Sequence, residues 1–405
     1  MKNVCLKYLF FLSVLLLPLS AGAMDFSLVL SQNAGIGNQT NEDGGFDYQL
    51  GILPGFSFLL GESGDLFISA GMTLGVEEED FYYIPELLRT EVSYRFGNGR
   101  IRAGRMQYAA PLPLVASGLF DGAQFSYNSS GGTFSAGVWY TGLLYKKNAN
   151  IIMTGEDKAL YEEPVIYDDF SGTYFAPGRF LASLDWEHPS IAELVNLKAA
   201  ITAQIDLSGG DMQYHSQYLT LKAAIPVKKF LFEIGGSFET AQLEYPAAAD
   251  KEPFNIAFAW DLGIFWTLPS SFNSRLSLTG QFAGGETDGL VGAFVPITTK
   301  FYGDVLKAGI SGLSVFALNY TARLVPSFGL SLTDSLFVRN DLGTYADYPA
   351  AAGSDGYFLG NELFARFIWS PVSDLQFNLG GGVFIPGPDE KSRWRVELSA
   401  ILAVY

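Results

Sequence analysis

The sequence has almost no cysteine or histidine, with one cysteine and two histidines among 405 residues. Cys5 precedes the first apolar run, so the rest of the chain has no thiol for a disulfide or a structural thiolate zinc site. His188 and His215 fall at opposite ends of the strands predicted below, and no Ser-His arrangement for hydrolysis can be built from them. Phosphate-loop and dinucleotide fingerprints are also missing. We therefore predict no enzyme, no cofactor and no metal site.

Long apolar runs are missing after Ser20. No later stretch approaches the roughly 18 apolar residues that a membrane helix needs. None shows a convincing helical spacing of apolar residues at i, i+3, i+4 and i+7. The chain is nevertheless 48% hydrophobic and 15% aromatic, and it contains 45 glycines. This apolar content must be accommodated in structure other than helices.

The N-terminal residues have the pattern of a secretory signal peptide. Lys2 and Lys7 come first, residues 8–20 are mainly apolar, and Ala21–Ala23 is a small-residue site. We expect residues 1–23 to be removed, which takes away two lysines and changes the formal charge from −17 to −19. An acidic chain without a basic cluster is poorly suited to nucleic acid, so no nucleic-acid partner is predicted.

Apolar residues alternate with small or polar residues over much of the chain. Between Phe46 and Leu60, and again between Phe254 and Trp266, most even positions are bulky and apolar, while the odd positions are mainly small or polar. A period of two indicates β-strands. A soluble sandwich buries its bulky face in a core, whereas a membrane barrel turns that face toward lipid and keeps small and polar groups for a wet interior.

Alternation and turn residues together mark about eighteen strands. Sixteen is the alternative count, because the first strand and the strands near Tyr145 and Arg179 are the least clearly marked. Connections after even-numbered strands are short, and connections after odd-numbered strands are mostly longer. The predicted strands cover residues 25–34, 45–60, 65–76, 87–96, 99–107, 120–128, 132–144, 179–188, 195–207, 214–225, 229–244, 254–267, 273–285, 312–324, 328–340, 360–371, 374–386 and 393–405.

Alternating short and long connections are typical of an outer-membrane barrel with tight periplasmic turns and long extracellular loops. We therefore predict an all-β fold, a transmembrane antiparallel up-and-down β-barrel in the outer membrane of a diderm bacterium. Residues 24–405 would form this single domain. The strand over residues 393–405 would pair with the first strand, so that no backbone edge faces lipid. Tyr405 resembles the terminal aromatic residue of such barrels, although its alternation groups it with Arg395 and Glu397.

Two stretches resemble a known group of channels. Residues 101–127 contain Gly104-Arg105 at the end of one strand and Asp121-Gly122 at the start of the next, and residues 375–387 read LQFNLGGGVFIPG ahead of a last strand that contains tryptophan. Both are similar to the substrate-specific eighteen-stranded porins, particularly the alginate-export type. The resemblance implies a monomeric channel through which an anionic or sugar-like solute diffuses.

Charged side chains occupy inward positions of several predicted strands. On residues 87–96 and 99–107 they lie opposite an apolar face that should include Leu88 and Ile101. Arg105 alternates with Ile101, so we expect either a bulge at Gly104 that turns it inward or a side chain that snorkels to the interface. The lumen candidates are Arg89, Glu91, Arg95, Arg100, Arg102, Arg105, Arg275, Arg323, Arg339, Arg366 and Arg395.

Two interpretations of these arginines stay open. In the first, they form a basic track that holds anions by charge-assisted hydrogen bonds. In the second, inward carboxylates pair with them and only keep a narrow lumen solvated. These carboxylates are Glu91, Asp206, Glu233, Asp261, Asp334, Glu362 and Glu397.

The predicted outer loops are of two kinds. Glu77–Asp80 and Gly155–Asp169 are acidic, which suits hard cations such as Ca²⁺ but is also common in solvated loops. Ala109–Phe120 and Gly289–Ile310 are apolar. Because apolar loops are costly in water, we expect one or both to fold into the barrel and constrict it, or to contact each other.

These patterns predict a porin-like channel for passive diffusion of small hydrophilic solutes, anionic or sugar-like, through a lumen lined by charged residues. The alternative is a closed structural or adhesin-type barrel that acts through its extracellular loops. The predicted partners are outer-membrane lipid, the small solutes and, during biogenesis, the barrel-assembly machinery. We expect a monomer, with an oligomer as the alternative.

Overall fold

The structure, a computed structural model, leaves the predicted signal peptide and Tyr405 outside the residues that it describes. It describes residues 24–38, 44–77, 80–246, 250–251, 254–285, 292–341, 357–387 and 391–404.

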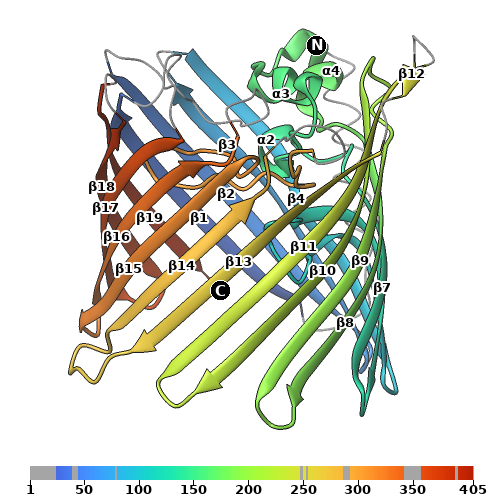
Figure 1. The fold of residues 1–405 in the computed structure, drawn as a ribbon, viewed down its shortest axis with the longest axis horizontal. Coiled ribbons are helices and arrows are strands. Elements are labelled where there is room, and N and C mark those ends of the chain that lie inside the picture. Colours follow the sequence, from blue (N-terminus) through green and yellow to red (C-terminus); the bar gives the residue numbers. More distant parts are fainter. Residues whose placement is uncertain are drawn as a thin grey trace.

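The described residues form a closed antiparallel β-barrel (Figure 1). Successive strands pair with each other, and β19 pairs with β1 to close the ring. Eighteen strands of the described residues form the wall, and β12 is a two-residue strand paired only with the end of β11. The strands are β1 Met24–Gly37, β2 Gly45–Leu60, β3 Gly64–Glu77, β4 Asp80–Phe96, β5 Gly99–Ala109, β6 Ser117–Ser129, β7 Gly132–Tyr140, β8 Arg179–Ile191, β9 Val195–Asp206, β10 Gln213–Val227, β11 Phe230–Tyr245, β12 Asp250–Lys251, β13 Asn255–Thr267, β14 Arg275–Ala283, β15 Leu313–Val325, β16 Phe328–Arg339, β17 Phe358–Val372, β18 Leu375–Pro386 and β19 Arg393–Val404.

The prediction of eighteen wall strands is confirmed, and the alternative of sixteen is wrong. Most boundaries agree within a few residues. The largest difference is at β4, which begins at Asp80 and not at residue 87. Because Glu77 of β3 pairs with Asp80 of β4, the ends of the acidic stretch Glu77–Asp80 belong to strands.

The two ends of the barrel differ. At one end, which we call the turn end, connections such as residues 97–98 are short. The other end, which we call the loop end, has longer connections, among them residues 141–178, which carry all the described helices, seen at the top of Figure 1. Among the described residues, no helix is long and apolar enough to cross a membrane. The helices are α2 Lys146–Ala149, α3 Gly155–Glu162, η1 Tyr167–Asp169 and α4 Phe170–Tyr174.

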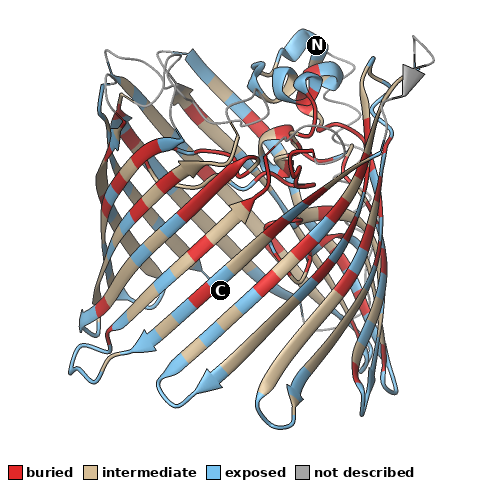
Figure 2. Ribbon diagram, in the orientation of Figure 1, coloured by how far each residue is buried: buried red, intermediate tan, exposed pale blue. Residues whose placement is uncertain are grey.

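The alternation of side chains gives the wall two different faces, and buried and exposed residues alternate along the strands in Figure 2. On β13, for example, Phe258 points outward and is 47% exposed, whereas its neighbour Ala259 points inward and is 2% exposed. Near the turn end the outward ring pairs Phe230 with Trp266 and Trp369 with Phe377 stack on each other. An apolar outer face with an aromatic belt is that of a barrel in lipid.

Two predicted orientations are wrong. The pairing of β3 with β4 shifts register between Ser69 and Ala70, so Leu88 is an extra residue and Leu87 takes the outward position. Asp334 does not face the lumen, because its cross-strand neighbours Leu318 and Leu363 both point outward. Its carboxylate instead accepts a hydrogen bond from the Asn361 side chain at 2.7 Å on the outer face.

We predict that Asp334→Leu stabilises the barrel. A carboxylate on the lipid face costs less than the roughly 2–4 kcal/mol of Arg or Lys at the bilayer midplane, so the gain should be on the order of 1 kcal/mol. The measurement is the urea midpoint of unfolding in lipid vesicles. The same change at the inward residue Asp261, which accepts a hydrogen bond from Gln281, should destabilise the barrel. Equal effects at both positions would contradict this assignment of faces.

Candidate pore constriction

The β5–β6 hairpin leaves the wall part-way along its length. β4 and β5 pair from Phe96 and Gly99 only as far as Thr90 and Arg105, whereas β5 stays paired with β6 up to Ala109. At the branch point Gly104 has φ +112°, and a Cβ there would lie 1.8 Å from the Thr90 carbonyl oxygen. Only glycine fits this backbone without a steric clash.

The tip of this hairpin folds into the lumen. Leu112 is fully buried and lies against Gly235 on the inner face of β11. Tyr108 stacks on Trp139 with ring centroids 4.5 Å apart, and its hydroxyl points to Asp185 of β8. The inward folding predicted for Ala109–Phe120 is therefore confirmed. The hairpin covers the part of the lumen that β7 to β11 enclose.

This inward fold leaves one edge of β4 without a neighbouring strand above Thr90, and side chains of residues 141–178 cover it. The Tyr167 hydroxyl accepts a hydrogen bond from the Tyr83 backbone N–H at 2.9 Å and donates one to the Tyr83 carbonyl at 3.2 Å. The Tyr174 hydroxyl donates to the Pro85 carbonyl at 2.6 Å. These bonds replace those of a missing strand.

Arg105 joins the hairpin to residues 141–178, the covering segment of β4. Its guanidinium group makes a bidentate ion pair with Asp121 at 2.9 and 2.8 Å and donates to the carbonyl oxygens of Leu87 and Leu143. Arg105 is 6% exposed. Arg105 therefore neither lines the open lumen nor snorkels to the interface. Both expectations are wrong, because the cross-strand partner Asp121 holds the side chain in a buried ion pair.

The connection between β14 and β15, described over residues 292–312, is the second inward segment. The Val295 backbone N–H donates to the Glu239 carboxylate of β11 at 2.9 Å, and the Val295 carbonyl accepts from the Tyr218 hydroxyl at 2.6 Å. The Ile297 backbone N–H donates to the Val115 carbonyl at 2.8 Å. The two predicted apolar loops thus both fold inward and contact each other, although residues 289–291 lie outside the described part.

Across the lumen the same segment is fixed to β17. The Glu362 carboxylate accepts three backbone N–H bonds, from Asp304, Val305 and Leu306, at 2.6 to 3.0 Å. The Asp304 carboxylate forms an ion pair with Arg366 at 2.8 Å. The segment is therefore held at β11 and at β17, and with the hairpin it divides the lumen.

One group of candidate residues lies together on the inner face of β4 and β5. Arg89 pairs with Glu91 at 2.7 Å, and Arg102 approaches the same carboxylate at 3.6 Å while donating to the Gln124 side chain at 2.5 Å. Arg100 donates to the Ser93 hydroxyl at 2.9 Å. We call Arg89, Glu91, Arg100 and Arg102 the β4–β5 cluster. It combines three guanidinium groups with one carboxylate.

A second group lies where residues 304–307 meet β2, β17 and β19. Arg366 pairs with Asp304 and Glu397, and Arg395 pairs with Asp47 at 2.9 Å and with Glu397 at 3.5 Å. Burial lowers the pKa of Lys307, and the Arg395 guanidinium lowers it further against the nearby carboxylates. We call Asp47, Asp304, Lys307, Arg366, Arg395 and Glu397 the β2–β19 cluster. Its three basic groups balance its three carboxylates.

The remaining candidates are spread along the wall. Arg95 is the cross-strand partner of Arg100 and adjoins the β4–β5 cluster. Arg275 and Arg323 lie near the turn end, where Arg275 stacks on Phe265 at 4.3 Å. Arg339 ends β16 at the loop end. The structure therefore brings together six of the eleven candidates in two clusters, and the arginine candidates do not form one continuous row.

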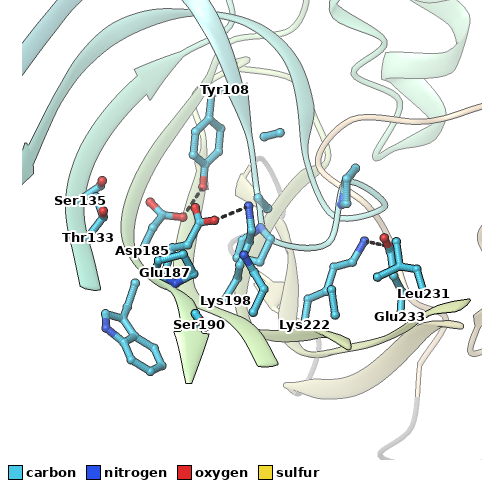
Figure 3. Close-up of a pocket in the computed structure, with 18 of the residues that line it drawn as sticks. Tyr108, Thr133, Ser135, Asp185, Glu187, Ser190, Lys198, Lys222, Leu231 and Glu233 are labelled. Atoms are coloured by element: carbon cyan, nitrogen blue, oxygen red, sulfur yellow. Dashed lines mark hydrogen bonds and ion pairs between the residues drawn. The ribbon is translucent and has the colours of Figure 1, made fainter. Parts of the chain in front are cut away.

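The sequence reasoning missed two lysines on the lumen face. Lys198 of β9 pairs with Glu187 at 3.0 Å, and Lys222 of β10 pairs with Glu233 at 2.7 Å. They flank a cavity of about 690 Å³ beneath the inward hairpin (Figure 3). Their alternation with outward Ile201 and Leu221 is the sequence signal that places them on the lumen face.

The acidic segment Gly155–Asp169 is held by contacts with other parts of the protein. Asp157 caps α3 and forms a buried ion pair with Arg179 at 2.6 Å, and Arg179 also pairs with Asp206. Burial raises the pKa of Asp157, and Arg179 opposes that shift. Over the described ranges no group of three or more His, Cys, Asp or Glu residues is arranged to hold a metal ion.

Comparison with known proteins places this geometry among outer-membrane proteins of Pseudomonas aeruginosa. OprD aligns with a TM-score of 0.59 at 14% identity, over 95% of this chain and 94% of that chain. OccK2 (OpdF) in complex with glucuronate gives 0.59 at 14%, over 94% and 97%. OpdK with vanillate gives 0.57 at 11%, over 94% and 98%. No family model and no curated protein matches the chain.

The chain has the fold of an eighteen-stranded outer-membrane porin. The resemblance noted at Gly104-Arg105 and Asp121-Gly122 is therefore confirmed for the fold. In this porin fold those four residues form the branch point at which the β5–β6 hairpin turns inward.

Replacing Gly289–Ile310 with a short Gly-Ser turn should raise the single-channel conductance of this porin fold, because it removes the segment fixed to Glu239 and Glu362. The measurement is the step size in a planar bilayer. The matched control shortens the exposed connection over residues 207–212, which should leave the step size unchanged. Equal steps in wild type and in the Gly289–Ile310 variant would show that this segment does not limit ion flow.

Arg105→Ala should destabilise the barrel strongly. The change leaves Asp121 without its cation and two carbonyl groups without a donor, and removing one partner of a buried ion pair costs about 3–5 kcal/mol. The measurement is the urea midpoint in lipid vesicles. Arg323→Ala, at an exposed turn-end arginine, should change the midpoint little. A similar small change for both variants would contradict the role given to Arg105.

Proposed function

We propose that the protein is a passive diffusion channel of the outer membrane, with the loop end extracellular and the turn end periplasmic. The porin fold and the apolar outer face support the location. OccK2 and OpdK were each solved with a small organic molecule, glucuronate or vanillate, which supports small hydrophilic solutes as the cargo of this fold. In this proposal the protein moves solutes and carries out no reaction on them.

The observation that favours anions is the charge of the β4–β5 cluster. Glu91 is the one carboxylate of this cluster and pairs with Arg89 and Arg102, while Arg100 donates only to Ser93, whereas the β2–β19 cluster is balanced. Arg100 and Arg102 can therefore donate charge-assisted hydrogen bonds to a solute carboxylate or phosphate, and no one-to-one ion pair has to be separated first. We therefore propose the basic-track interpretation for this wall and the pairing interpretation for the β2–β19 cluster.

Two substitutions that change the charge of the β4–β5 cluster in opposite directions test this proposal. Arg102→Gln should reduce the preference for anions, and Glu91→Gln should increase it. A unit charge about 4 Å from an ion in a water-like medium contributes about 1 kcal/mol, so each change should alter the anion-to-cation permeability ratio about fivefold. The measurement is the reversal potential of refolded protein in a planar bilayer under a salt gradient.

Arg323→Gln is the matched control, since it removes the same charge at the turn end. It should move the reversal potential less than Arg102→Gln. Shifts of the same sign for Arg102→Gln and Glu91→Gln would refute selection at the β4–β5 cluster. Silence of the wild-type protein at all voltages would favour the alternative, a closed structural or adhesin-type barrel.

A further inference from the structure

A cavity lies beneath the inward hairpin. Ala110, Pro111 and Pro113 of the hairpin tip line it, together with residues of β5 to β11. Figure 3 shows part of this lining. Ser190 near the end of β8 and Glu193 of the short β8–β9 connection line the cavity, so it reaches the turn end. Its volume of about 690 Å³ lies within the range of small-molecule sites.

The basic groups of this cavity already have acceptors. Lys198 pairs with Glu187 and Lys222 with Glu233, and Figure 3 shows them as two separate pairs in the cavity lining. Arg102 reaches Glu91 and the Gln124 side chain. An incoming anion would have to compete with these acceptors for each cation.

Asp185 is the one carboxylate of the cavity wall whose described contacts are all with hydroxyl groups. It accepts from the Ser183 hydroxyl at 3.0 Å and from the Tyr108 hydroxyl at 3.4 Å. A carboxylate offers about four lone-pair sites, so Asp185 can accept further donors. The Thr133 and Ser135 side chains stand on the same side of the cavity in Figure 3.

We propose that this cavity binds a neutral polyhydroxylated solute of monosaccharide to disaccharide size, on the turn-end side of the constriction. A hydroxyl group both donates and accepts, so it bridges an intact Lys–Glu pair and also donates to Asp185. Pro111, Pro113 and Leu231 supply apolar surface for the C–H faces of such a solute. This inference rests on the proposed channel function and adds a second, uncharged class of solute to it.

The first test measures the ion current of single channels with trehalose added on either side. Wild type should show a saturable, concentration-dependent block. Asp185→Asn should weaken it about tenfold, the loss expected when a hydrogen bond to a charged group is replaced by a neutral one. Asp261→Asn, at an inward carboxylate outside the cavity, should leave it unchanged. Both variants must form discrete channel steps and show the wild-type shift in gel mobility on heating, and Glu187→Gln serves if Asp185→Asn does not fold.

The outcomes separate the two proposals. Channel steps with a trehalose effect no larger than the change in solution conductivity would overturn the cavity assignment and leave the channel function standing. Stronger block by glucuronate than by trehalose would overturn the neutral class. If no channel steps appear, the proposed function fails, and calorimetric titration of the detergent-solubilised protein with trehalose decides the cavity alone. Heat that is reduced in Asp185→Asn supports the assignment, and no heat overturns it.

Discussion

The structure depends on one constraint, that backbone N–H and C=O groups in contact with lipid must be hydrogen-bonded within the protein. Pairing of β1 with β19 meets this constraint around the ring. It is broken locally where the β5–β6 hairpin turns inward, because β4 then loses a neighbour. Hydroxyl groups of Tyr167 and Tyr174 and the guanidinium of Arg105 take the place of the missing strand. The constriction and the covering segment 141–178 therefore form as one unit.

Hydrogen bonds to polar groups of the wall also explain how the apolar loops are held inside a wet lumen. Apolar contacts between Leu112, Val115 and Ile297 remove these side chains from water but do not fix a direction. Direction comes from carboxylates of the wall, since Glu239 and Glu362 accept backbone N–H bonds of the inward segment. Charge-assisted bonds of this kind are about twice as strong as neutral ones. The wall thus determines where the lumen is narrow.

Sequence patterns predicted what depends on local alternation and missed what depends on pairing between strands. The period of two identified all eighteen wall strands and most of their faces, and loop composition identified both inward segments. The extra residue at Leu88 is invisible in the sequence because a bulge is defined only by the partner strand. Asp334 is different. It lies two residues from Leu332 and from Leu336, so the alternation alone already placed it on the outer face with them. The partner of Arg105 could not be predicted, because it follows from the register of β5 with β6.

An excess of acidic residues over the whole chain does not prevent a preference for anions inside it. Many carboxylates lie on exposed connections at the loop end, such as Glu162 and Asp168, where water and salt screen them. Others in the lumen are committed to individual partners, as Glu233 is to Lys222. A narrow passage between low-dielectric walls responds mainly to the charges nearest to it. At the β4–β5 cluster three arginines lie beside one glutamate, and the proposed preference for anions rests on this local excess of positive charge.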